Sequence, residues 1–220
     1  MERKKLVELK TPAESKNLVL VLVNGDYPSV VYDEDDGVRV YTLRCPLQQK
    51  AFIKYLRPAT VILQFHTLTE LQQLLDMQLQ KVIVSIEPGL LTLTAESTIT
   101  FQLIRYLCQK YECDLICARE FDISEVKRII ELDFPIDPTC GESLYIPHSW
   151  DSWGKIVLHG RSVQEWAGVI RSEETLAQLD DTRLDDYLEK YVKTVEVEEP
   201  VRVPQTMDEF VRAVYEEKIN

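Results

Sequence analysis

Apolar residues along the chain first form strand-length runs and then alternate with helix-length stripes. Residues 17–24 (NLVLVLVN) are continuously apolar, which predicts a strand buried on both faces. Residues 29–33 and 38–45 flank an Asp-Gly pair, Asp36-Gly37, and this pair between two β-rich runs predicts a hairpin. Further strands are predicted at 60–65, 81–86 and 114–118, and helices at 46–56, 68–79, 98–111 and 123–132.

This alternation predicts the fold class. Strands and helices in turn are typical of an α/β protein with a mostly parallel sheet and helices on both faces. Two further short strands are predicted at 143–146 and 155–158, around a pair of tryptophans. The expected division is an N-terminal extension (1–16), an α/β domain (17–160) and a C-terminal helical extension (161–220).

The C-terminal extension is more acidic and carries apolar stripes. Leucines and tyrosines between residues 176 and 192 predict one or two amphipathic helices. A second stripe at helical spacing is formed by Met207, Phe210, Val211, Val214 and Tyr215. Such helices either close over the α/β domain or dock on another protein, and the pattern leaves both possibilities open.

Composition excludes several classes of protein. The chain has 220 residues, 45% of them hydrophobic and 28% charged, which is typical of a globular protein and not of a disordered or collagen-like one. Its net charge of −12 disfavours nucleic-acid partners. No apolar run approaches the roughly 20 residues of a membrane-spanning helix, and the N-terminus is charged from its second residue. We therefore expect a cytoplasmic protein, or a nuclear one, without membrane insertion.

The positions where an α/β protein binds nucleotides carry none of the required residues. Ligands of such sheets bind beyond the carboxyl ends of the strands. After the first strand, residues 25–29 (GDYPS) contain one glycine and no lysine, whereas a phosphate-binding loop needs several glycines and a lysine. The stretches after the other strands, 44–46, 87–89 and 118–120, offer no magnesium ligand or guanine-reading motif. The sequence therefore predicts that the protein binds no nucleotide cofactor. It also predicts that the phosphate-binding loop and the helix that would follow the first strand are missing.

Few residues in the sequence suggest a catalytic or metal-binding site. His66 follows a predicted strand, and with Glu87 it would be the basis of a small α/β enzyme, although packing or simple exposure accounts for it better. The five cysteines have no paired spacing, and Cys113 and Cys117 alone make a poor metal site, so buried reduced thiols are favoured. We predict no catalytic residue, no metal site and no cofactor.

The most unusual local composition lies at residues 145–156 (YIPHSWDSWGKI). Trp150 and Trp153 stand three residues apart in what reads as a loop. Either they fill a gap between the sheet edge and the following helices, or they form an interaction anchor, since aromatic residues often dominate binding interfaces. The sequence does not decide between these two roles.

Four segments in order resemble a known family. They are an apolar strand running into an emptied nucleotide loop, residues 106–111 (YLCQKY), residues 114–118 (DLICA) and residues 145–159 (YIPHSWDSWGKIVLH). This order is similar to that of the light intermediate chains of cytoplasmic dynein, whose Ras-like domain carries Phe-Ile-Pro-x-Gly-Trp-Asp followed by Lys-Lys-Ile and Leu-His at matching offsets. The resemblance covers most of residues 17–160 and is specific at 145–159, where Ser149 replaces the usual glycine.

The resemblance implies a non-catalytic subunit of a microtubule motor. It predicts a degenerate, nucleotide-free Ras-like domain that binds the tail of the dynein heavy chain, next to other dynein subunits, on the cytoskeleton. The tail by which family members bind cargo adaptors does not follow Asn220 in this sequence, so either the chain is a shortened member or the tail lies outside this sequence. Residues expected at the partner are Trp150, Asp151 and Trp153, and the stripe at Met207, Phe210, Val211, Val214 and Tyr215. The alternative is a degenerate scaffold subunit of another complex.

Overall fold

The structure is a computed structural model, and it describes residues 18–23, 30–44, 46–88, 95–139, 141–161, 169–179, 184, 186 and 187. In these residues the strands are β1 (Leu18–Val23), β2 (Val30–Asp35), β3 (Val38–Arg44), β4 (Thr60–Leu63), β5 (Lys81–Ile86), β6 (Asp114–Cys117) and β7 (Tyr145–Ile146). The helices are α1 (Lys50–Leu56, preceded by the 3-10 turn Pro46–Gln49), α2 (Leu68–Leu75), α3 (Ala95–Lys110), α4 (Ile123–Glu131), α5 (Trp153–Arg161) and α6 (Glu173–Gln178). The α/β prediction is confirmed.

The strands form one mixed sheet in the order β2-β3-β1-β4-β5-β6-β7. Strands β1, β3, β4, β5 and β6 are parallel, while β2 and β7 run antiparallel at the two edges. The apolar run of β1 is fully buried because the strand lies in the interior of the sheet, paired with β3 on one side and β4 on the other. This arrangement is consistent with a Ras-like α/β fold.

The β2–β3 hairpin closes as its sequence predicts. Asp36 and Gly37 are the two residues between the strands, and both have positive φ, 50° and 77°. Two positive φ values in a two-residue loop define the tight turn whose twist matches that of the strands. The hairpin returns the chain beside β1, with Arg39 opposite Leu18.

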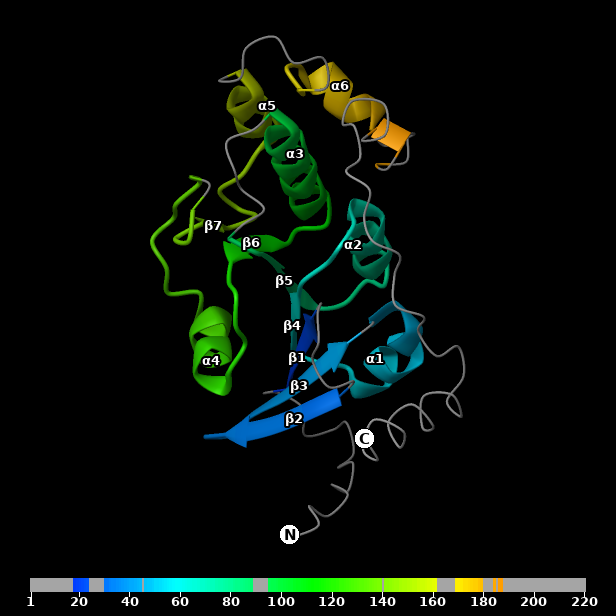
Figure 1. The fold of residues 1–220 in the computed structure, drawn as a ribbon, viewed down its shortest axis with the longest axis vertical. Coiled ribbons are helices and arrows are strands. Elements are labelled where there is room, and N and C mark those ends of the chain that lie inside the picture. Colours follow the sequence, from blue (N-terminus) through cyan, green and yellow to red (C-terminus); the bar gives the residue numbers. More distant parts are fainter. Residues whose placement is uncertain are drawn as a thin grey trace, which may run out of the picture.

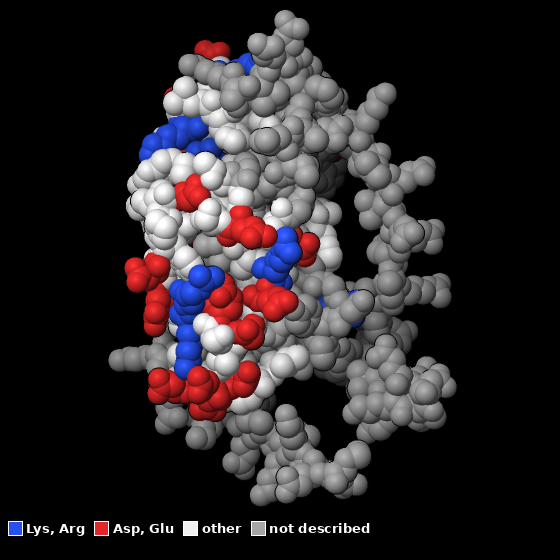
Figure 2. Space-filling model, turned by 60° about the vertical axis from the view of Figure 1, so that its left-hand side comes forward, with Lys and Arg blue, Asp and Glu red and all other residues white. Residues whose placement is uncertain are grey.

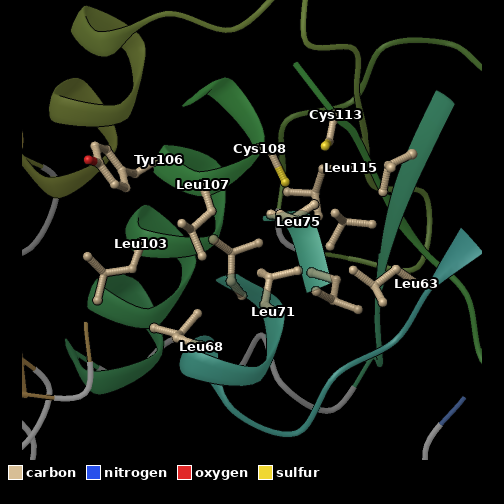
Figure 3. Close-up of a cluster of buried hydrophobic side chains, with 14 of the residues drawn as sticks. Leu63, Leu68, Leu71, Leu75, Leu103, Tyr106, Leu107, Cys108, Cys113 and Leu115 are labelled. Carbon is tan, nitrogen blue, oxygen red and sulfur yellow. The ribbon is translucent and has the colours of Figure 1, made fainter. Parts of the chain in front are cut away.

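Helices cover both faces of the sheet, but unequally (Figure 1). On one face, α1, α2 and α3 pack over the alternate leucines of β1, and α5 and α6 join the same apolar cluster. Figure 3 shows part of it, with Leu71 and Leu75 of α2 facing Leu103 and Leu107 of α3. On the other face, α4 packs Val126 and Ile129 against the valines of β1. It is the only helix that the described ranges place there.

Helix α3 is buried along most of its length. Every residue from Phe101 to Cys108 is buried, because α2 and the sheet lie on one side of the helix and α5 on the other. The described helix α5 therefore forms an additional layer outside α3.

Two predicted elements differ from the structure. Residues 155–158, predicted as a strand, lie in α5. Their Ile-Val-Leu run is β-like, but Ser152 caps a helix there by accepting a hydrogen bond from Lys155 N, 3.3 Å away. Consequently Trp153 opens a helix, and only Trp150 lies in a turn. The predicted strand 143–146 is reduced to Tyr145–Ile146.

The expected C-terminal helices are described in part. Helix α6 buries Leu176 against the core cluster and is capped by Ser172. The proposed boundary at residue 160 falls within the last turn of α5. No described helix combines the length and the apolar character that crossing a bilayer demands.

Candidate functional site

The segment between β7 and α5 folds back onto α3. After Ile146 the chain turns through Pro147, whose carbonyl oxygen accepts hydrogen bonds from Trp150 N (2.9 Å) and Asp151 N (3.2 Å). This turn places the Asp151 carboxylate over the middle of α3. Residues 150–156 and the part of α3 that they contact are called the clasp below.

The center of the clasp is a buried ion pair. Arg105 donates from Nε to Asp151 Oδ2 at 2.8 Å and from its terminal nitrogen to Oδ1 at 2.6 Å. The two side chains are only 3% and 4% exposed. A bidentate pair of this kind fixes both partners, and removing either one would leave a buried charge without its counterpart.

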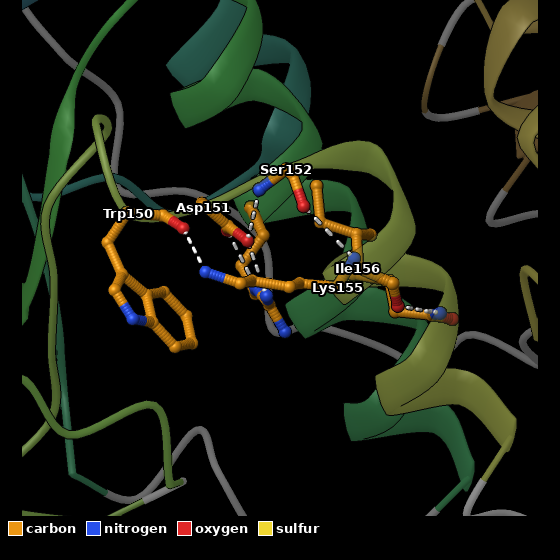
Figure 4. Close-up of polar contacts among 7 residues, drawn as sticks. Trp150, Asp151, Ser152, Lys155 and Ile156 are labelled. Atoms are coloured by element: carbon orange, nitrogen blue, oxygen red, sulfur yellow. Dashed lines mark hydrogen bonds and ion pairs between the residues drawn. The ribbon is translucent and has the colours of Figure 1, made fainter.

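Local contacts hold the rest of the clasp in place (Figure 4). Asp151 Oδ1 also accepts a hydrogen bond from Ser152 N at 2.8 Å, so the carboxylate organises the start of α5 as well as binding Arg105. Lys155 donates to the carbonyl oxygen of Trp150 and lies 3.6 Å from the center of its ring. Trp150 is half-buried against the core cluster.

Trp153 is the part of this segment that remains accessible. It is 38% exposed, and its ring packs on Tyr106 of α3 with 5.5 Å between centroids. Leu158, further along α5, is 58% exposed. Three residues of this segment are predicted to bind a partner. The Trp153 side chain is accessible to one, Trp150 is accessible in part, and the Asp151 carboxylate is bound to Arg105 inside the protein.

A second polar anchor lies one turn earlier on α3. The Gln102 side chain donates to the carbonyl oxygens of Ile156 and Ile170, both at 2.8 Å, and accepts from Ile170 N at 3.0 Å. Gly160 of α5 approaches so closely that an added Cβ would lie 2.4 Å from both Gln102 Nε2 and Ile170 O. Gln102 thus ties α5 and the chain before α6 to the same helix.

The carboxyl edge of the parallel sheet is bridged by its own side chains. Gln64 follows β4, Ser85 lies near the end of β5, and both donate to the carbonyl oxygen of Ala118 after β6, at 3.5 and 3.4 Å. Gln64 is 5% exposed and Ser85 1%. These contacts connect three neighbouring strand ends where a ligand of this fold type would bind.

The structure does not bring His66 and Glu87 into any contact that would mark a catalytic pair. Both are exposed. The backbone N–H of His66 donates to the Glu70 carboxylate at 2.8 Å, which makes this position part of the start of α2. The role of His66 in an enzyme stays a prediction.

The other two histidines contact the core elements. His148 Nδ1 lies 3.2 Å from Asp114 Oδ1, beside β6. His159 packs edge-on against Phe101 of α3, with 5.1 Å between ring centroids. Burial and the neighbouring Arg105 guanidinium lower the pKa of His159.

Two of the three described cysteines, Cys108 and Cys113, are buried, and Cys117 is half-buried. Cys108, Cys113 and Cys117 are free, and burial raises the pKa of each of them, that of Cys113 to about 12. Such thiols are poor nucleophiles and poor metal ligands. Within the described ranges, no three His, Cys, Asp or Glu side chains come together as ligands of a metal ion would.

The surface on the α4 side is mainly acidic. Figure 2 shows Asp and Glu side chains gathered toward one end of this face, with Lys and Arg among them. Asp33, Glu34 and Asp35 of the hairpin are exposed there, and Lys127 pairs with Asp35 at 2.5 Å. The described side chains on this surface form no continuous basic patch of the kind by which proteins bind nucleic-acid phosphates.

The predicted stripe at Met207, Phe210, Val211, Val214 and Tyr215 lies outside the described residues. What the sequence reading missed is the role of α3. Gln102 and Arg105 interrupt its apolar pattern, but nothing in the sequence distinguishes this polar stripe from one that faces water.

Comparisons with known proteins give no relatives. No family model matches this chain, and neither a curated protein nor a solved structure resembles it significantly.

Proposed function

We propose that this chain is a light intermediate chain of a cytoplasmic dynein. In this role it is a non-catalytic subunit that binds and stabilises the tail of the heavy chain during transport along microtubules. The observation that carries the proposal is the segment 145–159, whose residues resemble the family motif. It runs from an edge strand onto the outer layer of the fold.

The topology supports the degenerate Ras-like part of the proposal. The strand order, with β2 antiparallel beside β3, is consistent with a Ras-like sheet. Only residues 24–29 separate β1 from β2. That stretch is too short for a phosphate-binding loop followed by a helix that crosses the sheet.

The contacts at the carboxyl edge support a structural role over a catalytic one. In a nucleotide-binding member of this fold type the ligand would connect the strand ends. Here Gln64 and Ser85 make that connection with the carbonyl oxygen of Ala118. Both buried side chains donate to a partner within the protein, so neither donor is left for a ligand.

The proposal places the partner against the exposed side of α5. Trp153 and Leu158 supply apolar surface there, and an exposed aromatic residue held by a rigid neighbour is a common interface anchor. Asp151 acts from inside, because its pairing with Arg105 fixes the orientation of the helix that carries Trp153.

Co-purification tests the proposal. The tagged chain is co-expressed with a dynein heavy-chain tail and passed over a size-exclusion column with light scattering. We expect one complex with equal numbers of the two chains. A chain that elutes alone and folded would overturn the dynein assignment, and recovery with an unrelated assembly from its native cytosol would favour the scaffold alternative.

Two exposed aromatic residues provide a matched pair of variants. We expect Trp153→Ala to weaken the complex and Tyr55→Ala, at a 52% exposed position on α1, to leave it unchanged. Thermal unfolding of the free chains checks that both variants are folded. Equal binding by both variants would remove α5 from the interface.

A further inference from the structure

Helix α3 has a polar stripe on the side opposite its apolar one. Thr98, Gln102, Arg105 and Gln109 follow each other at spacings of four, three and four residues, which places them along one side of a helix. This is the pattern of a helix whose outer side faces water. In the structure the stripe is covered, and Thr98, Gln102 and Arg105 are 9%, 0% and 3% exposed.

The cover comes from described residues on both sides of residues 162–168. Asp151, just before α5, pairs with Arg105, and Gln102 binds Ile156 within α5 and Ile170 before α6. Helix α6 in turn contacts α5. We call the described part of this cover, residues 151–161 and 169–179, the outer layer.

We infer that the outer layer is latched to α3 by the Arg105–Asp151 pair and opens as a single unit while the sheet and α1 to α4 stay folded. The physical reason lies in what opening exposes. Arg105, Asp151 and Gln102 all regain full hydration when the layer leaves, so the polar stripe is compatible with water.

Apolar contacts oppose the opening. The apolar side chains Ile156, Ile170 and Leu176 are 0 to 3% exposed and favour the closed state. The apolar surface therefore stabilises the closed state, and hydration of a few polar groups stabilises the open state. Because these interactions form and break together, the layer is a local cooperative unit.

Native-state hydrogen exchange of the wild-type chain, followed by mass spectrometry at increasing urea, is the first test. We expect the amides of α5 and α6 to exchange together, through an opening with a lower free energy and a weaker urea dependence than that of β1, β4 and β5. Exchange of both regions through the same transition would overturn the inference, because the layer would then open only with global unfolding.

The latch is tested with Asp151→Asn. We expect α5 and α6 amides to exchange roughly tenfold faster or more, and the strand amides, which exchange only after the layer has opened, to speed up by no more than the same factor. The control is Glu142→Gln, which neutralises the carboxylate of the 68% and 80% exposed pair with Arg119 and should change neither region. No acceleration of α5 and α6, acceleration of the strands alone, or failure of the Asp151→Asn chain to fold would each contradict a latch that acts on the outer layer.

Discussion

Helices α3 and α4 each turn an apolar side toward the sheet, from opposite faces, and differ in what meets their other side. The polar side of α4 lies in water, where Arg128 pairs with Glu125 at 2.5 Å and Asp122 caps the helix. The polar side of α3 is covered by α5, with Gln102 and Arg105 buried. Apolar periodicity therefore indicates which side of a helix meets the sheet, but not whether the other side stays exposed.

The two arginines give the largest expected difference between the helices. Arg105→Ala leaves the Asp151 carboxylate buried without its partner, so we expect the free energy of unfolding to fall by about 3–5 kcal/mol. Arg128→Ala removes a 62% exposed side chain from a surface pair and should cost at most about 1 kcal/mol. Urea denaturation followed by far-ultraviolet circular dichroism measures both, because it reports the helices and strands of the whole protein. Equal losses would mean that the two polar sides are equivalent.

Two glycines of α5 test how closely the cover approaches α3. At Gly160 an added Cβ would lie 2.4 Å from the backbone oxygen of Ile170, so Gly160→Ala should destabilise the protein by about 1–3 kcal/mol. At Gly154 the nearest atom is Glu173 Oε1, 3.8 Å away. Gly154→Ala should therefore be neutral or stabilise the helix by up to about 1 kcal/mol. Thermal unfolding compares the two variants, and a neutral Gly160→Ala would argue against the close packing.

Acidification should weaken the α3–α5 contact through His159. Burial and the nearby Arg105 lower its pKa in the folded state, so the unfolded state binds more protons. Stability is then lost as the pH falls through the ordinary histidine pKa of about 6.5. We expect His159→Gln to reduce this loss in urea midpoints measured between about pH 7.5 and 5.5. His66→Gln, at an exposed position, is the control, and an unchanged slope in His159→Gln would assign the loss to other groups.

The smallest effect is expected at the start of α4. Asp122 accepts hydrogen bonds from Ser124 Oγ and Glu125 N, which lower its pKa. Asp122→Ala should destabilise the helix slightly, and Asp122→Asn should restore most of the loss because an amide oxygen can still cap. Circular dichroism during thermal unfolding measures the difference. If Asp122→Ala destabilised the protein more than Arg105→Ala, the exposed polar side of α4 would contribute more to stability than the covered polar side of α3, contrary to our expectation.

Much of the fold could be predicted because each signal in it is local. The continuous apolar run of β1 and the Asp36-Gly37 turn determine their own conformations, and both are confirmed. The strand predicted at 155–158 is wrong because four β-like residues fit either element. The deciding signal was Ser152, which caps the helix. Trp153, Ile156, Val157 and Gly160 also recur at helical spacing.

The candidate site could be predicted only in part, because its decisive contacts join distant residues. Trp150 and Trp153 stand out by composition. The partner of Asp151 is Arg105, 46 positions earlier, and no local pattern connects the two. Gln102 likewise binds the backbone of residues 54 and 68 positions later. A polar stripe on a helix looks the same in sequence whether water or another helix covers it.

The position of β1 has a consequence for the order in which the chain acquires its structure during translation. Both neighbours of β1 come later in the chain, since β3 ends at Arg44 and β4 at Leu63. As the ribosome extends the nascent polypeptide, the Leu-Val run therefore has no partner strand on either side until these segments have emerged. Such an unpaired apolar strand is the kind of segment that chaperones bind, and it makes early synthesis the stage at which this protein is most prone to aggregate.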